Sequence, residues 1–302
     1  MKHWTTYPLT AHPSNPELFA GDAVGRFARA AEAAGFDGIA FTDHPAPSHK
    51  WLTAGGHDAL DPFAALSFVA AATERLRLIP NIVVLPYRNP FLVAKAAATL
   101  DSLSGGRFVL SVATGYLRSE YRALGVDFAR RNELFDEALA VIRGAWTTDD
   151  FSFEGHDFTA SGVTANPKPR HVPIWIGGNS ALTRRRVARL ADGWNPFPAP
   201  RQLAETARTQ PLETLDDLAP MIEHLRRHTE DAGRDPGTID VAFTTGLSGP
   251  AEDGFDADAH LEALDRMAGL GVTWSSVGVP GDSLAHATEA LERYGEEVIA
   301  RR

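Results

Sequence analysis

The chain has 302 residues, of which 44% are hydrophobic and 23% are charged, and it carries a formal net charge of −10 and no cysteine. This much apolar side chain can bury enough surface to fold, so disorder is not expected. A nucleic-acid partner is not expected either, because binding phosphate needs a cationic surface. The lack of cysteine excludes disulfides and thiolate chemistry, and it fits a cytoplasmic protein.

Neither a membrane anchor nor a secretory leader is expected. No stretch of the sequence approaches the ~20 consecutive apolar residues that span a bilayer. The first residues, Met1 to Tyr7, contain no apolar core followed by a cleavage site.

Short β-rich runs alternate with longer alanine-rich helical runs along the chain. The predicted strands cover 3–9, 37–42, 76–85, 107–113, 173–176, 239–244 and 272–277. The predicted helices cover 22–34, 62–74, 90–103, 131–146, 180–191, 215–231, 257–268 and 282–302. Asp61-Pro62 and Asn89-Pro90 each place a capping acceptor before a proline at the first helical position. Most strands are nearly continuous apolar runs, which is typical of parallel sheets buried on both faces.

About seven or eight such βα units leave two architectures, a closed barrel or an open doubly wound sheet. An open sheet that binds a dinucleotide would carry G-x-G-x-x-G after its first strand, and Leu9 to Pro13 contains no such loop. We therefore predict an α/β fold, a (β/α)8 TIM barrel, forming one domain over residues 1–302. A segment at about residues 147–172 is predicted to form a hairpin insertion. The proline-rich segment at about 196–220 is predicted to form an excursion over one face of the barrel.

Functional side chains of a barrel collect where its strands end. There the sequence places, among others, Asp43-His44, Thr114 to Glu120, Gly177 to Ser180 and Asp192 to Asn195. A histidine can exchange protons near pH 7, although an Asp–His contact can also simply shape a loop. Two glycines before a helix can cradle a phosphate, although a tight turn capped by Asn179 fits the same residues.

Other chemistries find less support in the sequence. Arg184-Arg185-Arg186 fit a solvated helix face better than an anion site. No His-x-His pair, His-Glu-x-x-His motif or G-x-S-x-G elbow occurs, so we expect neither a metal centre nor a serine nucleophile. Trp51, Trp194, Phe197 and the two insertions are candidate walls of a substrate pocket, with ordinary hydrophobic packing as the alternative.

Several segments together resemble one family. They are Gly35-Phe36-Asp37-Gly38 with Thr42-Asp43-His44-Pro45, Ala72 to Leu78, Arg88-Asn89-Pro90, Thr99 to Arg107, Asn166 to Pro169, Pro173 to Ser180 and Ala191 to Trp194. In order and spacing they resemble the bacterial luciferase-like superfamily, and within it the actinobacterial branch that uses the deazaflavin coenzyme F420.

The resemblance implies a luciferase-like barrel with a flavin-like ring in its mouth and the phosphate held by Gly177, Gly178 and Asn179. It also implies that His44, beside Asp43, faces the reactive side of the ring. A bulge with a non-proline cis peptide in the third strand would support the ring, and it aligns with Asn81-Ile82. Asn81, Ile82, Thr114 and Gly115 are then expected to contact the ring or the ribityl chain, and Asp43 is expected among the cofactor-binding residues.

One residue departs from the family pattern. Sugar- and alcohol-oxidising members have a glutamate after Thr-Gly, where this chain has Tyr116. A phenol with a pKa near 10 donates a hydrogen bond but is a poor base at pH 7, which favours reduction of a carbonyl, imine or alkene.

The resemblance thus predicts an F420-dependent oxidoreductase that transfers a hydride to or from a small organic substrate, with His44 as the acid/base and Tyr116 as a second donor. The alternatives are an FMN-dependent monooxygenase supplied by a partner reductase and a non-catalytic flavin-binding relative. A homodimer is expected by the same resemblance.

Overall fold

The computed structural model describes residues 1–302. Its main sheet is entirely parallel and runs in the order β3-β2-β1-β11-β10-β9-β8-β5-β4. The strands are β1 (Lys2–Thr6), β2 (Gly38–Phe41), β3 (Arg77–Pro80), β4 (Val83–Val84), β5 (Leu110–Ala113), β8 (Ile174–Gly177), β9 (Gly193–Asn195), β10 (Asp240–Thr244) and β11 (Trp274–Val277). The two edge strands, β3 and β4, are the halves of one interrupted strand, so the sheet closes on itself as an eight-unit barrel. The predicted TIM-type barrel is confirmed.

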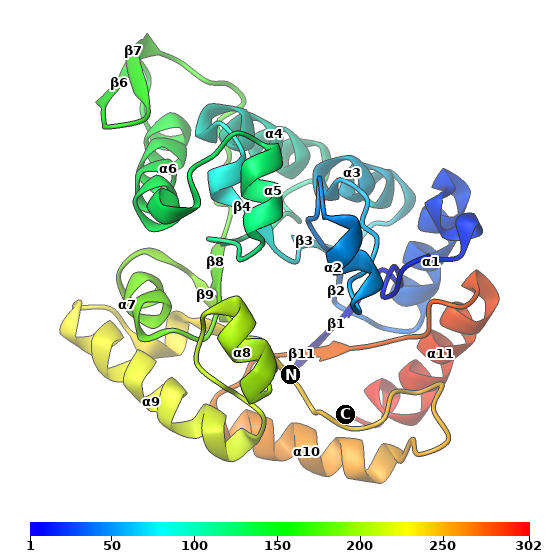
Figure 1. Cartoon of the computed structure of the whole chain (residues 1–302). Helices are drawn as coiled ribbons and strands as arrows, with labels where there is room; N and C mark the ends of the chain where they lie inside the picture. Colours follow the sequence, from blue (N-terminus) through cyan, green and yellow to red (C-terminus); the bar gives the residue numbers. More distant parts are fainter.

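Helices surround the barrel in chain order (Figure 1). They are α1 (Gly21–Ala33), α3 (Pro62–Ala72), α4 (Pro90–Leu103), α6 (Arg131–Thr147), α7 (Ala181–Leu190), α9 (Leu215–Asp231), α10 (Ala257–Leu270) and α11 (Leu284–Glu297). The predicted caps are present: Asp61 Oδ1 accepts hydrogen bonds from the backbone of Phe63 and Ala64, both at 3.0 Å, and Asn89 caps α4. None of these helices combines the length and apolarity that crossing a bilayer requires.

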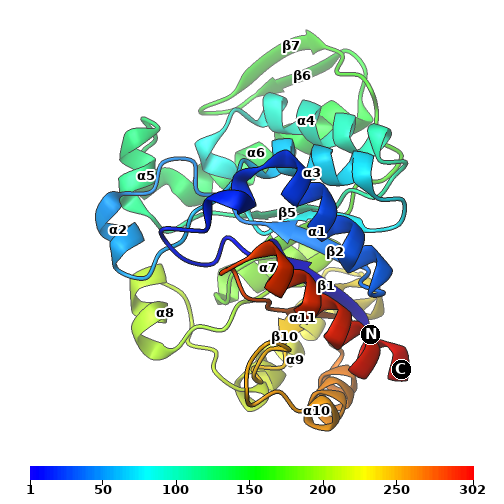
Figure 2. The same ribbon diagram turned by 90° about the vertical axis from the view of Figure 1, so that its right-hand side faces the viewer.

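Three short helices, α2 (His49–Thr53), α5 (Arg118–Ala123) and α8 (Arg201–Ala207), lie together at one end of the barrel, away from both termini (Figure 2). They follow the carboxyl ends of β2, β5 and β9. The predicted hairpin is present as the antiparallel pair β6 (Phe151–Glu154) and β7 (Thr159–Val163), which projects from the barrel on the far side of α6.

Two sequence predictions need correction. Asp192 to Asn195 were expected to follow a strand, but 193–195 form strand β9 itself. Three residues that begin with glycine are too short to show strand periodicity. The single strand predicted over 76–85 is broken between β3 and β4, where the Asn81–Ile82 peptide is cis, as the resemblance implied.

The barrel interior is filled by tryptophans. Trp4, Trp175 and Trp274 are each at most 2% exposed, and their rings meet edge to face with centroids 5.4–6.4 Å apart. Gly193 makes room for them, because a Cβ there would lie 2.3 Å from the Trp175 ring. This aromatic layer blocks a continuous channel through the barrel. Within the barrel, space for a ligand is therefore expected at the carboxyl ends of the strands.

Candidate active site

A cavity of about 340 Å³ lies at the carboxyl ends of the strands. Its lining comes from the segments after β2, β3, β5 and β8 and from the α8 region. The lining residues are Asp43, His44, Asn81, Ile82, Val84, Ala113, Thr114, Gly115, Tyr116, Gly177, Gly178, Ser180, Thr183, Phe197, Leu203, Ala207, Arg208 and Thr209. Every residue assigned to the site from the sequence lines this cavity except Asn179. The structure therefore gathers segments that lie more than 150 residues apart in sequence, while the role of each residue stays a prediction.

His44 is held from behind by a buried carboxylate. Its Nδ1 lies 3.2 Å from Glu120 Oε2, and the two side chains are 12% and 1% exposed. A carboxylate can only accept, so His44 Nδ1–H donates, and Nε2 is left without a protein partner on a side chain that lines the cavity. The alternative of a simple Asp–His contact is not what the structure shows, because the partner of His44 is Glu120 rather than Asp43.

Glu120 is saturated by donors. Besides His44, the backbone N–H of Ala46 donates to Oε1 at 3.1 Å, and the Tyr87 hydroxyl donates to Oε2 at 3.1 Å. Burial and the adjacent Glu120 carboxylate raise the pKa of Tyr87, so this phenol keeps its proton. Three donors aimed at one carboxylate hold it in a single orientation.

Sequence reasoning placed Glu120 at the mouth of the barrel but assigned it no role. It lies on α5 between Arg118 and Arg122, both exposed, so the local pattern is that of a solvated helix. The one usable signal is its position shortly after β5, where barrel loops carry function. Its contact with His44 joins residues 76 apart in sequence, and no local pattern predicts such a contact.

The Asp43 carboxylate is bound within the protein. Its carboxylate accepts from Arg88 Nη1 at 2.6 Å and Nη2 at 2.8 Å, and from the backbone N–H of Val84 at 3.0 Å. Both oxygens are thus occupied within the protein. Although Asp43 lines the cavity, its bonds tie the loop after β2 to β4 and so hold His44 and Ile82 on neighbouring walls.

Tyr116 and two further rings surround His44. The centroids of Tyr116, His57 and Trp51 lie 6.4, 5.0 and 4.5 Å from that of His44. Burial, followed by the nearby charge of Glu120, raises the pKa of Tyr116, which fits a hydrogen-bond donor rather than a base. Burial lowers the pKa of His57, which favours its neutral form.

The end of the cavity after β8 carries several groups that can donate to an anion. Ser180, Thr183 and Thr209 contribute hydroxyls and Arg208 a guanidinium, and no carboxylate lines this end. Ser180 also caps α7, whose N-terminus adds positive potential. This set was missed in part because Arg208 and Thr209 belong to the irregular segment after β9, where sequence patterns carry little information.

The glycine turn acts differently from a free amide cradle. The backbone N–H of Gly178 donates to Asn195 O at 3.3 Å, and that of Asn179 donates to Thr209 Oγ1 at 3.1 Å. The Asn179 side chain is fully buried and bonds to Phe197 and to the carbonyl of Gln210. Asn179 therefore fastens the 196–210 segment over the cavity and does not itself face a ligand.

Some residues that were expected to form walls of the substrate pocket do not line the cavity. Trp194 is fully buried, with its Nε1–H donating to Gly178 O at 2.9 Å, so it belongs to the core. Residues 147–172 contribute nothing to the cavity lining, whereas 196–220 contribute Phe197 and the α8 region. The predicted solvated face of 184–186 is also wrong in part, because Arg184 and Arg186 are buried.

Gly177 keeps the cavity wall in place. A Cβ at this position would lie 2.1 Å from Ile82 Cδ1 and 3.3 Å from Asn195 O. Gly177→Ala is expected to push Ile82 into the cavity, to lower stability by about 1–2 kcal/mol as overpacking does, and to weaken ligand binding about 10-fold, which corresponds to ~1.4 kcal/mol. Thermal unfolding and titration with flavin or deazaflavin measure both effects.

Gly269 provides the matched control for this substitution. It lies in α10, and a Cβ there would meet no atom within 4 Å. Gly269→Ala is expected to leave binding unchanged and to raise stability by up to about 1 kcal/mol through helix propensity. Equal behaviour of the two variants would refute the role given to Gly177.

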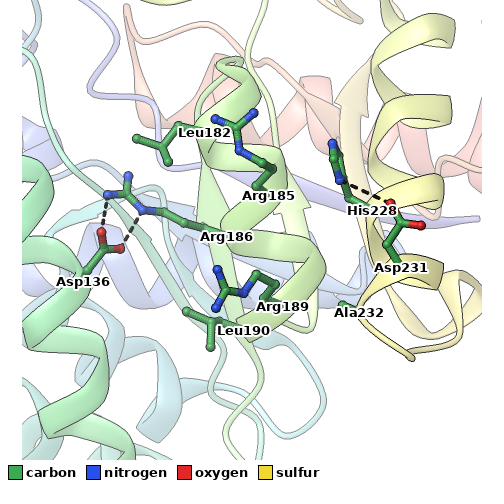
Figure 3. A pocket seen from close by; sticks show the side chains of 9 residues that line it. All are labelled: Asp136, Leu182, Arg185, Arg186, Arg189, Leu190, His228, Asp231 and Ala232. Carbon is green, nitrogen blue, oxygen red and sulfur yellow. Dashed lines mark hydrogen bonds and ion pairs between the residues drawn. The ribbon is translucent and has the colours of Figure 1, made fainter.

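A second and larger hollow lies outside the barrel, between α6, α7 and α9. It measures about 520 Å³ and is lined by Asp136, Leu182, Arg185, Arg186, Arg189, Leu190, His228, Asp231 and Ala232 (Figure 3). Arg186 forms a two-pronged ion pair with Asp136 across it. None of the side chains predicted to be functional reaches this groove, so the strand-end cavity is the candidate active site.

Sequence relatives cover most of the chain. An uncharacterised protein of Mycobacterium tuberculosis is 31% identical over 288 residues, which cover 91% of this chain and 93% of that protein. The F420-dependent glucose-6-phosphate dehydrogenase of Nakamurella multipartita is 29% identical over 286 residues, covering 93% of this chain and 76% of the relative. The FMNH2-dependent dimethylsulfone monooxygenase of Pseudomonas putida is 36% identical, but over 128 residues, 40% of this chain and 35% of that enzyme.

The fold has close counterparts among solved structures. The monooxygenase RslO1 from Streptomyces bottropensis superposes with a TM-score of 0.82 at 20% identity, over 100% of this chain and 99% of that one. The family model described as luciferase-like monooxygenase matches residues 1–264, from β1 into α10. Relatives in this family use either F420 or FMN, which supports a flavin-type cofactor and an oxidoreductase. The chain belongs to the luciferase-like monooxygenase family.

Proposed function

We propose that this protein is an F420-dependent oxidoreductase that transfers a hydride between reduced F420 and a small organic substrate. The observation that carries the proposal is the pairing of His44 with the buried Glu120 at one end of a cavity whose other end carries the hydroxyls of Ser180, Thr183 and Thr209 and no carboxylate. One relative with a named activity that aligns along nearly the whole chain is an F420-dependent dehydrogenase.

The cavity fits a phosphorylated ring system. The hydroxyls of Ser180, Thr183 and Thr209 suit a phosphate, because hydroxyl groups can donate to its oxygens. Ile82, whose side chain fills the space left by the missing Cβ of Gly177, gives the cavity an apolar wall against which a flat ring can lie. Bound there, F420 supplies the hydride chemistry, and the protein supplies orientation and proton handling.

His44 is the residue we assign to proton transfer. Its Nδ1 is committed to Glu120, so Nε2 can give or take a proton on the cavity side. Tyr116, whose raised pKa keeps it protonated, donates a hydrogen bond to a substrate oxygen or nitrogen from the same side. One exchangeable proton and one fixed donor suit the reduction of a polarised double bond.

Titration with each cofactor tests the proposal. Oxidised F420 is expected to bind with a saturable change in its fluorescence and more tightly than FMN. The bound, reduced cofactor is expected to be stable in air and to be reoxidised by members of a panel of ketones, imines and enones. Tight FMN binding without F420 binding would overturn the assignment.

FMN-dependent oxygenation is the alternative, and the FMNH2-dependent relative supports it over part of the chain. Oxygen separates the two functions, since reduced FMN reacts with it rapidly and reduced deazaflavin hardly at all. The identity of the small substrate, a reductase that supplies reduced cofactor, and the homodimer stay predictions.

A further inference from the structure

Three arginines gather around one phenylalanine at the rim of the cavity. The guanidinium carbons of Arg118, Arg131 and Arg208 lie 4.4, 4.2 and 5.5 Å from the ring centroid of Phe128. They come from three separate elements: Arg118 begins α5, Arg131 begins α6, and Arg208 ends α8. The fold therefore brings together positive charges up to 90 residues apart in sequence.

These charges have no counter-ions within the protein. Fourteen ion pairs form in the structure, from His12–Asp58 to Arg302–Asp265, and none involves Arg118, Arg131 or Arg208. Burial lowers the pKa of Arg131, and the neighbouring charges of Arg208 and Arg118 lower it further. In a chain with a net charge of −10, three unpaired cations that repel one another are not expected from fold stability alone.

The helix that starts at this point adds to the positive potential. Arg131 is the first residue of the 17-residue α6, where the helix dipole already disfavours a cation. Its Nη1 donates to the carbonyl of Phe128 at 3.1 Å, which fixes the guanidinium beside the ring. An anion placed here would relieve both the mutual repulsion and the unfavourable dipole.

The cluster borders the cavity and is joined to it by direct contacts. Arg208 lines the cavity beside Thr209, at the end that holds the hydroxyls. Phe128 packs edge to face on Tyr121 with centroids 5.1 Å apart, and the Tyr121 hydroxyl donates to the carbonyl of the cavity residue Thr114. Phe128 is 8% exposed, so it forms a fixed base for the three guanidinium groups.

We propose that Arg118, Arg131 and Arg208 form an anion clamp that binds a carboxylate or phosphate group of the bound ligands other than the phosphate assigned above to Ser180 and Thr183. The inference deepens the proposed function. The anion is either the carboxylate-bearing tail of F420, which FMN lacks, or an acidic group of the substrate. Both sources present the same oxygens to the same arginines, so the experiment must separate them.

The test uses the full chain and the double variant Arg118→Gln/Arg208→Gln. Arg131 is kept, because it also supports Phe128. Dissociation constants are measured for F420 with its oligoglutamate tail, for the tail-free deazaflavin phosphate and for FMN. Inorganic pyrophosphate is then titrated calorimetrically into the protein loaded with the tail-free deazaflavin phosphate. Arg185→Gln/Arg189→Gln is the matched control, since these exposed arginines line the outer groove of Figure 3.

The expected result is a loss of about 10-fold in affinity for tailed F420, the size of two lost surface charge contacts. The two tail-free cofactors are expected to change less than 2-fold, and the control variant is expected to match the wild type. Unchanged cofactor affinity, together with pyrophosphate binding that the double variant loses, would instead assign the clamp to an acidic substrate.

The clamp is wrong if neither tailed F420 nor pyrophosphate distinguishes the variant from the wild type, or if tailed and tail-free cofactors weaken equally. Failure of the wild type to bind any deazaflavin would overturn the proposed function separately. The pyrophosphate arm, run on FMN-loaded protein, would then still decide on the clamp.

Discussion

Replacing His44 by alanine is expected to lower turnover by about 10²–10⁴-fold, the usual contribution of a general acid or base. The Nε2 atom of His44 is left without a protein partner, and no other imidazole lines the cavity. Cofactor affinity is expected to change less than 3-fold, or about 0.6 kcal/mol, because the phosphate-binding end lies elsewhere in the cavity. Single-turnover oxidation of bound reduced F420 by an organic acceptor measures the first effect, and equilibrium titration measures the second.

His57 supplies the control for this prediction. Its ring lies 5.0 Å from that of His44, but its Nδ1–H donates to the carbonyl of Asp58 and it is not part of the cavity lining. His57→Ala is expected to reduce turnover by no more than about 10-fold, through looser packing around His44. If His44→Ala and His57→Ala cost the same, proton transfer at His44 is the wrong assignment.

Much of the scaffold follows from the sequence because its signals are local. N-caps with a following proline mark α3 and α4, and apolar runs mark the inner strands. The short strand β9 was not predicted, because three residues carry no periodic signal. The break at Asn81–Ile82 was expected from the family resemblance, and nothing in the hydrophobic run from 76 to 85 would have predicted it.

Only part of the candidate site could be predicted from the sequence, and the physical reason is different. Residues next to strand ends, such as His44 and Gly177, are visible because the barrel rule assigns their position. Partners such as Glu120 and Arg208 lie on short helices whose placement depends on packing between distant loops. Asn179 shows the converse error: its position was right, but its hydrogen bonds are spent on fixing residues 197–210.

Glu120→Gln is expected to lower turnover by about 10²–10⁴-fold, by analogy with carboxylates that orient a catalytic histidine. The carboxamide keeps one acceptor for the backbone N–H of Ala46 and turns its NH2 group toward His44 and Tyr87. His44 Nδ1 must then accept instead of donate, which moves the proton of the neutral ring to Nε2. The imidazole stays in place in the wrong tautomer.

The nitrogen resonances of His44 report this change directly, since NMR distinguishes the two neutral tautomers. Glu120→Ala measures how much Glu120 contributes to the stability of the fold, apart from its effect on the orientation of His44. It leaves three buried donors without an acceptor and is expected to lower the free energy of unfolding by about 3–5 kcal/mol. The control is Glu133, an exposed residue that forms an ion pair with Arg130. Glu133→Gln is expected to change neither turnover nor the tautomer of His44.

A double-mutant cycle then decides whether Glu120 acts through His44. If it does, Glu120→Gln adds little once His44 is alanine, because no ring remains to be oriented. Independent action would multiply the two losses. Full additivity with an unchanged His44 tautomer would reduce Glu120 to a packing residue, and the cavity would then hold an unsupported histidine whose reactivity the surrounding fold does not explain.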